Sequence, residues 1–333
     1  TKAYEIQGSL CLGTSLNQLG YDHVFYVKLA SGAVFSSLLS KGNEKIVHRT
    51  INHILLDGPS LRSYRHFPNV GKRKSWAAAD ASKRGIELAK ISQLNDEVYS
   101  SIQDDKNWGF EKNYLNDSEI KFGKELNDWV IQNVLFKVLF PAEFHGQSAV
   151  EGAIKLSKEF NQNIDKVKKI NIFTHEPAIR IIANKENLSN ASDRDHSLEY
   201  MVSAALLFGE LKYEMYGNDF SGLNKIESLR KKIVVSEDSN FTKNYYEFSK
   251  RHISNSIEIV YDDNSTSEKI TIENPIGHPS RREEAIPLLK DKFIRNVQKV
   301  LSLEKSMSLW EQVINLEKDD ELTKFFNILQ DDE

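Results

Sequence analysis

The sequence predicts an α+β fold in which an all-helical domain comes before a smaller α+β domain. Residues 1–133 carry apolar residues at three- and four-residue spacing, with no alternation of strands and helices. Residues 134–284 mix helical periodicity with short β-branched runs, as an α+β domain does. Residues 285–333 return to the helical pattern, and we expect them to pack back on the first domain.

Four helices are expected in the first domain, at residues 4–19, 24–39, 43–56 and 75–91. The third is expected to end before Asp57-Gly58-Pro59, because glycine and proline interrupt helices. Ser75 is expected to cap the fourth helix, whose alanine-rich start favours helix strongly. A turn is expected at Trp108-Gly109-Phe110.

The second domain is expected to begin at residues 134–140, an apolar run that forms a strand or an extended entry and ends at Pro141. Helices are predicted at residues 148–160 and 194–211, and strands at residues 167–174 and 231–236. The clearest strand signal is a hairpin, in which a polar turn joins residues 257–261 to residues 269–273.

Composition excludes several classes of protein. The 333 residues carry a formal net charge of −4, whereas a dedicated nucleic-acid-binding protein is basic. No apolar run approaches the roughly 20 residues that span a bilayer, so we expect a soluble protein. The single cysteine, Cys11, excludes an internal disulfide framework and a cluster held by three or four thiolates. No two histidines have HxxxH spacing and no GxSxG motif occurs, so neither a metal site nor a serine nucleophile is expected.

A basic loop within residues 57–85 is the strongest functional signal. It carries six cationic or potentially cationic side chains before its helix: Arg62, Arg65, His66, Lys72, Arg73 and Lys74. Such a loop favours anion binding, because the backbone N–H groups and dipole of a helix N-terminus add to the side-chain charge. A solvated basic loop is the alternative. The aromatic residues Tyr64, Phe67 and Trp76 favour a loop that packs against the protein.

Several other segments carry groups that bind anions or transfer protons. His23 stands at a helix start, where it either faces a ligand or fills a structural role. Lys137 lies inside the apolar run at residues 134–140, so it must pair, snorkel or serve a function. Glu143 and His145 follow where the chain passes between the domains.

The remaining candidates lie in two later segments. His196 and Tyr200 are spaced i,i+4, which predicts that they share one face of a helix capped by Asp193 or Asp195. His278 lies in a second basic loop, after a strand. Cations, imidazoles and a tyrosine spread over interdomain segments suit a small polyanionic substrate and proton-transfer chemistry.

Seven segments together resemble the MmgE/PrpD family. In chain order they are AYEIQG at 3–8, GYDHV at 20–24, DGPSLRSYRHFPNVGKRKSWAAADASKRG at 57–85, NVLFKVLFPAEFHGQSAVEGA at 133–153, THEPAIRII at 174–182, DRDHSLEYMVSAALLFGEL at 193–211 and NPIGHPSRREEAIPLL at 274–289. The resemblance implies a helical domain and an α+β lid with the active site between them, a homodimer, and a reaction that needs no metal or nucleotide. The substrate it implies is a small tricarboxylate, 2-methylcitrate, which loses water to give 2-methyl-cis-aconitate in the methylcitrate cycle of propionate catabolism.

The resemblance also implies which residues act. His23, Lys74 and Tyr200 match active-site positions of the family, and Lys137 matches a second lysine. The side chains expected to contact substrate are Arg62, His66, Arg73, His145, His196 and His278. Dehydration needs a base, an acid and cations that stabilise the developing dianion. We therefore expect Lys74, Arg73 and Arg62 to hold carboxylates, and His23 or Tyr200 to move protons.

Two alternatives stay open. A cis-aconitate decarboxylase or another isomerase-type member would share the architecture and act on a different acid. The chain also begins after the segment that supplies an aspartate and a catalytic histidine in the family, so an inactive relict or a dimerisation partner is the second alternative. The expected compartment is the cytosol of a bacterium or the mitochondrial matrix of a eukaryote.

Overall fold

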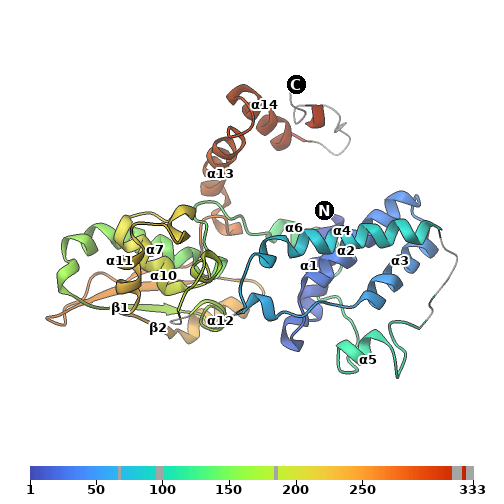
Figure 1. Ribbon diagram of the computed structural model, residues 1–333, viewed down its shortest axis with the longest axis horizontal. Helices are drawn as coiled ribbons and strands as arrows, with labels where there is room; N and C mark the ends of the chain where they lie inside the picture. The colour runs from blue at the N-terminus through green and yellow to red at the C-terminus, as the bar shows by residue number, and fades with distance from the viewer. Residues whose placement is uncertain (67–68, 95–98, 100, 184–186, 317–324, 328–333) are drawn as a thin grey trace. The chain divides into compact units, whose positions relative to one another are not determined.

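The computed structural model describes residues 1–66, 69–94, 99, 101–183, 187–316 and 325–327 (Figure 1). The chain forms two compact units. The helical unit comprises residues 1–134 and 188–193, and the α+β unit comprises residues 135–187 and 194–333. Helices dominate the first and a small mixed sheet lies in the second, which confirms the predicted fold class. Within the described ranges, no helix is both long and apolar enough to cross a membrane.

The helical unit is built around α2, which packs against α1, α3 and α4. Its helices are α1 (Lys2–Gly13), α2 (Val24–Leu39), α3 (Glu44–Asp57), α4 (Arg73–Leu94), α5 (Phe110–Tyr114) and α6 (Trp129–Asn133), with 3-10 turns at Leu16–Leu19 and Ser63–Arg65. Buried side chains from these helices form one core: Leu10, Leu16, Phe25, Tyr26, Leu29, Ile54, Leu55, Leu88, Phe110 and Leu115. Asn43 caps α3 by accepting a hydrogen bond from the Lys45 amide.

Helices α2 and α4 run in the same direction and touch through their backbones. Ser31 Oγ lies 3.1 Å from Ser82 Oγ, and one turn away Gly32 faces Gly85. A Cβ atom on Gly85 would lie 2.4 Å from the Lys28 carbonyl oxygen and 3.0 Å from the Gly32 nitrogen. The small residues therefore allow a helix contact that larger side chains would prevent.

The α+β unit contains a four-stranded sheet in the order β2-β1-β3-β4. The strands are β1 (Val167–Thr174), β2 (Ile233–Glu237), β3 (Asn255–Tyr261) and β4 (Ile270–Ile272). Strand β1 pairs parallel with β2 and antiparallel with β3, so Ile170 lies opposite both Ile233 and Ile259. All three isoleucines are fully buried, which fixes the strand register.

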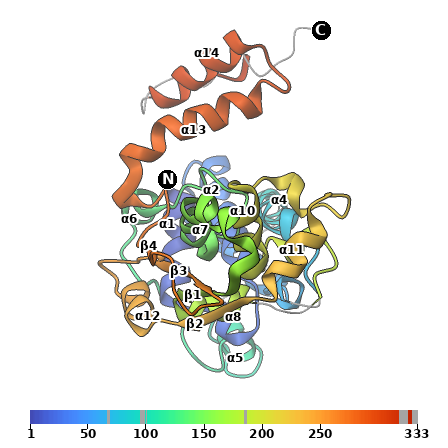
Figure 2. The same ribbon diagram turned by 90° about the vertical axis from the view of Figure 1, so that its left-hand side faces the viewer.

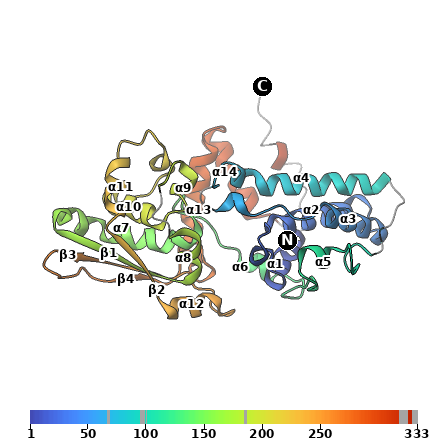
Figure 3. The same cartoon turned by 60° about the horizontal axis from the view of Figure 1, so that its bottom comes forward.

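Helix α7 (Gln147–Gln162) packs on β3 and β4, and α10 (Leu198–Phe208) packs on α7 (Figures 1 and 3). The other helices of this unit are α8 (Glu176–Ile182), α11 (Leu223–Arg230), α12 (Ser239–Tyr246), α13 (Arg282–Val297) and α14 (Leu303–Ile314). Helices α13 and α14 pack against each other as a pair (Figure 2). Packing of this C-terminal pair on the helical unit stays a prediction.

Several predicted boundaries were wrong at helix starts and ends. The helix predicted over residues 4–19 ends at Gly13, where a Cβ would meet the Lys121 carbonyl oxygen at 2.1 Å, and Thr14 turns to an extended conformation. Ser75 is not a cap, because α4 already begins at Arg73. The run at residues 134–140 forms an extended entry and no strand.

The helix predicted over residues 194–211 is shorter, because α10 begins at Leu198 and ends at Phe208. Helix α9 (Ala191–Arg194) ends before α10, which Ser197 caps by accepting from the Tyr200 amide. The predicted caps Asp193 and Asp195 do not fill that position. The hairpin is confirmed, since β3 and β4 pair antiparallel. The C-terminal helical pattern gives α13 and α14, and part of residues 285–333 lies outside the described ranges.

We predict that Gly85→Ala destabilises the helical unit by about 1–3 kcal/mol, because the new methyl group would overlap backbone atoms of α2. Thermal unfolding followed by calorimetry measures the change. Gly152→Ala in α7 is the matched control, since its Cβ would meet neighbours at 3.6–3.8 Å, an ordinary contact. That variant should gain about 0.4–1 kcal/mol. Equal effects of the two changes would contradict the backbone contact.

Candidate active site

A short backbone pairing brings two functional segments of the helical unit together. The Asp22 amide donates to the Ser60 carbonyl over 2.8 Å, and the Arg62 amide donates to the Gly20 carbonyl over 3.0 Å. Gly20 adopts φ 83°, a left-handed conformation that favours glycine. The start of α2 is thereby held beside the basic loop.

The Asp22 carboxylate is fully buried and holds the loop in place. It accepts hydrogen bonds from Arg65 Nε at 2.7 Å and from the Val24 amide at 3.1 Å. Burial alone would raise the pKa of Asp22, but the hydrogen bonds, led by that of Arg65, outweigh it and lower the pKa. Arg65 is therefore paired with Asp22, and its charge is largely balanced within the protein.

His23 is a neutral imidazole in a cationic environment. Arg62 Nη1 lies 3.2 Å from His23 Nδ1, and a guanidinium can only donate, so Nδ1 accepts and the ring proton stands on Nε2. Burial lowers the pKa of His23 to about 4, helped by Arg65, Arg62 and Lys74 and opposed by Asp22. The side chain is still 38% exposed, so a ligand can reach it.

The structure brings four of the predicted residues together in the helical unit. Arg62 Nε donates to His66 Nε2 over 3.2 Å, next to its contact with His23. Lys74 lies in the first turn of α4, close enough to lower the pKa of His23. Arg73 is separate, because its guanidinium lies over the rings of Tyr64 and Trp76, 5.2 and 4.5 Å from their centroids.

Tyr200 and His196 of the α+β unit both form polar contacts with neighbouring groups. Tyr200 is fully buried, and its hydroxyl donates to the Met215 carbonyl. Burial raises the pKa of Tyr200 to about 12, so it keeps its proton at neutral pH. His196 lies before α10 and contacts the Asp195 carboxylate through Nδ1. The expectation that the two share a helix face was wrong, because α10 begins at Leu198.

Lys137 and His145 stand in the entry segment of the α+β unit. The Lys137 side chain is exposed, so the expected cost of burying its ammonium does not arise. His145 Nδ1 lies 2.8 Å from Nε2 of the buried His175. Tyr245 stacks on His175 with ring centroids 4.8 Å apart. Burial lowers the pKa of His175 to about 4, helped by the neighbouring His145.

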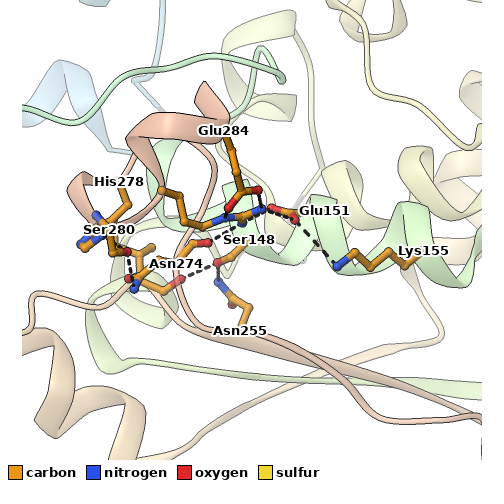
Figure 4. A network of polar contacts seen from close by, with 10 residues as sticks. Ser148, Glu151, Lys155, Asn255, Asn274, His278, Ser280 and Glu284 are labelled. Carbon is orange, nitrogen blue, oxygen red and sulfur yellow. Dashed lines mark hydrogen bonds and ion pairs between the residues drawn. The ribbon is translucent and has the colours of Figure 1, made fainter. Parts of the chain in front are cut away.

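His278 closes a polar network in the second basic loop (Figure 4). Its Nδ1 accepts from the Ser280 amide over 3.2 Å and caps the turn that leads into α13. The adjacent Arg281 is held between two carboxylates, with bonds of 2.9 and 3.1 Å to Glu151 and of 2.8 and 3.0 Å to Glu284. The charge of Arg281 is therefore compensated inside the protein.

Sequence reasoning missed two residues that organise these clusters. The sequence held one signal for Asp22, its position between Tyr21 and His23. A buried aspartate must pair with a cation, so a cationic partner could have been expected. His175 directly follows β1 and comes two residues before Pro177, where the chain turns into α8. Nothing in the sequence places it beside His145, 30 positions earlier. Across the described part of the chain, no three His, Cys, Asp or Glu side chains are placed to hold a metal ion.

Comparison with family models identifies the class of protein. A model described as the MmgE/PrpD N-terminal domain matches residues 1–123, and one described as the MmgE/PrpD C-terminal domain matches residues 140–318. The chain therefore belongs to the MmgE/PrpD family, which confirms the resemblance that the sequence segments indicated.

Curated proteins similar to this chain include bacterial and fungal enzymes. It is 42% identical over 299 residues to 2-methylcitrate dehydratase of Escherichia coli (strain K12), covering 89% of this chain and 62% of that protein. It is 41% identical over 300 residues to the mitochondrial 2-methylcitrate dehydratase of Yarrowia lipolytica, covering 89% and 58%. It is 34% identical over 311 residues to 2-methylcitrate dehydratase-like protein oryR of Aspergillus oryzae, covering 91% and 62%. The chain thus spans about three-fifths of the length of these relatives.

We predict that Lys74→Met raises the pKa of His23 from about 4, because it removes one of the cations that oppose protonation. Titration of the imidazole by NMR measures the change. Lys72→Met is the matched control, since Lys72 is an exposed neighbour that does not act on His23. An unchanged His23 titration in Lys74→Met would remove Lys74 from the cluster.

We also predict that the buried imidazole pair makes the fold acid-sensitive. The folded pKa of His175, about 4, lies below the ordinary 6.5, so the unfolded chain binds more protons and stability falls as pH drops from 6.5 to 4. His175→Asn should reduce this fall by up to about 3 kcal/mol in urea unfolding. The control His48→Asn changes an exposed histidine and should leave the pH dependence as it is. A wild-type stability that is flat over this range would refute the prediction.

Proposed function

We propose that the chain is a hydro-lyase that acts on 2-methylcitrate, removing water to give 2-methyl-cis-aconitate in the methylcitrate cycle of propionate catabolism. Its similarity to 2-methylcitrate dehydratases over most of its own length supports this substrate. The observation that carries the proposal is the neutral imidazole of His23, held among the cations Arg62 and Lys74. A tricarboxylate supplies the negative charge that this cluster lacks.

The reaction has simple requirements. A base removes a proton from the carbon next to a carboxylate, the electron pair forms the carbon–carbon double bond, and the hydroxyl leaves with a proton as water. Negative charge grows on the neighbouring carboxylate as the carbon–hydrogen bond breaks, so fixed cations around it lower the barrier. In the helical unit, Lys74 and Arg62 are the proposed cations, because Arg65 already pairs with Asp22.

Substrate binding should change the protonation of His23. In the free protein burial keeps its pKa low, helped by the cations Arg65, Arg62 and Lys74, and Nε2 carries the only ring proton. Three substrate carboxylates would offset those cations, so the pKa of His23 rises toward its ordinary value in the complex. An imidazole that titrates near neutral pH can accept the carbon-bound proton or donate one to the leaving hydroxyl.

The α+β unit supplies two further candidates. Tyr200 retains its proton, since its pKa is raised to about 12, so its proposed part is that of a donor. For that role its hydroxyl must leave the Met215 carbonyl when substrate binds. The exposed ammonium of Lys137 is a proposed carboxylate contact. We further propose a homodimer as the working form, in the cytosol or, as with the Yarrowia relative, in mitochondria.

We predict that Lys74→Ala weakens 2-methylcitrate binding by about 1.5–3 kcal/mol, or roughly 10- to 150-fold, because a charge-assisted contact is lost. Calorimetric titration measures binding, and the appearance of the conjugated double bond in the ultraviolet measures turnover. Lys72→Ala removes an exposed neighbouring charge and should leave both unchanged.

Three results would contradict the proposal. The first is a wild-type chain that neither binds nor dehydrates 2-methylcitrate. The second is a Lys74→Ala variant that equals the Lys72→Ala control. The third is loss of carbon dioxide from cis-aconitate that is faster than loss of water from 2-methylcitrate. Addition of 2-methylcitrate should also raise the pKa of His23 in the NMR titration.

A further inference from the structure

A pocket in the helical unit lies between α2, α4 and the loop after α3. Its volume is about 210 Å³. Its charged lining consists of Lys28 from α2, Asp57 from the end of α3, and Arg73, Asp80 and Arg84 from α4. Residues 73, 77, 80 and 84 follow at helical spacing, so they form one face of α4. His23, Arg62, His66 and Lys74 do not line it.

Part of the charge in this pocket is balanced internally. Arg84 donates to both Asp57 carboxylate oxygens, over 2.7 and 3.1 Å. Lys28 Nζ lies 3.5 Å from the same carboxylate and donates to the Gly58 carbonyl over 2.9 Å. Among the lining residues one carboxylate thus faces two cations, and Glu87, outside the lining, lies 3.8 Å from Arg84 Nη1 and offsets part of the remaining positive charge.

Arg73 presents a guanidinium that is oriented but has no carboxylate partner among the residues that the structure describes. The rings of Tyr64 and Trp76 hold it flat. A guanidinium restrained in this way loses little conformational freedom on binding a carboxylate through two parallel hydrogen bonds. Nothing in the packing of α4 requires an arginine at this exposed position.

Asp80 supplies the opposite charge two turns along the same helix, about 10.5 Å farther by helical rise. Burial lowers the pKa of Lys28, and Asp80 opposes that shift from a distance, but Asp80 forms no ion pair in the described parts of the chain. The lining therefore offers an anion site at Arg73, a cation site at Asp80 and the remaining positive charge near Lys28. Its formal sum is three positive and two negative side chains.

We propose that this pocket binds a small dicarboxylic α-amino acid, such as aspartate or glutamate, as an effector. One carboxylate pairs with Arg73, the ammonium group pairs with Asp80, and the second carboxylate meets the positive charge of Lys28. The ligand's net charge of −1 complements the +1 of the lining. The volume of about 210 Å³ suits a ligand of this small size.

Calorimetric titration of the 333-residue chain with L-glutamate and L-aspartate tests the proposal. One equivalent of at least one of them should bind, and Arg73→Gln should weaken that affinity at least tenfold. Asp80→Asn should weaken amino-acid binding at least tenfold while leaving glutarate, which lacks the ammonium group, bound as before. The emission of Trp76, which contacts Arg73, should shift on binding, and Trp76→Phe assigns that signal.

Controls separate this pocket from the candidate active site. Lys72→Gln, a change outside the lining, should leave amino-acid binding unchanged, and so should Lys74→Ala. Absence of binding by both amino acids, binding unaffected by Arg73→Gln, or an equal loss of glutarate and amino acid in Asp80→Asn would overturn the proposal. Competition between L-glutamate and 2-methylcitrate, with loss of both in Lys74→Ala, would also overturn it. None of these outcomes depends on whether the chain dehydrates 2-methylcitrate.

Discussion

Burial of the Asp22 carboxylate is the interaction on which the chemistry of the helical unit depends. A carboxylate removed from water must be paired, and Arg65 pairs with it at 2.7 Å. That bond ties the basic loop to the start of α2 and leaves Arg62 beside the imidazole of His23. The same loop therefore contains one arginine that is paired with a carboxylate and another that lies beside an imidazole whose pKa is lowered mainly by burial. Local pairing thus decides which cations of the loop can serve a ligand.

The sequence predicted those elements whose pattern is local. Residues 24–39 and 167–174 form a helix and a strand with the expected ends, because an apolar face of period 3.6 and a β-branched run bounded by turns need no distant information. The boundaries that failed have two causes. Gly13 ends α1 because the distant residues 121–123 lie against it, and α10 begins only at Leu198 because Ser197 caps it after a polar segment.

The sequence predicted which residue types occur at the candidate site. It could not predict which side chains they contact there. The cluster of charge at residues 62–74 is visible in the sequence, and Lys74 lies close enough to His23 to help lower the pKa of its imidazole. Sequence cannot show that Arg73 turns toward aromatic rings, or that Arg281 lies between two carboxylates. Each outcome depends on which side chains lie within a few ångströms after folding. Two neighbouring cations can therefore differ, one pairing with a carboxylate and the other lying over aromatic rings.

The contact between Gly32 and Gly85 bears on how ligand preference can diversify in proteins built this way. Because the backbones of α2 and α4 touch at Gly32 and Gly85, the spacing of the two helices is tightly set, and with it the places of His23 and Lys74 near their starts. A larger side chain at Gly85 would push the helices apart, so a change there alters the whole helical unit and not one contact of the site. Accommodation of a longer or bulkier acid must then come from side chains beside the helices, such as Arg62, which can change without separating α2 from α4.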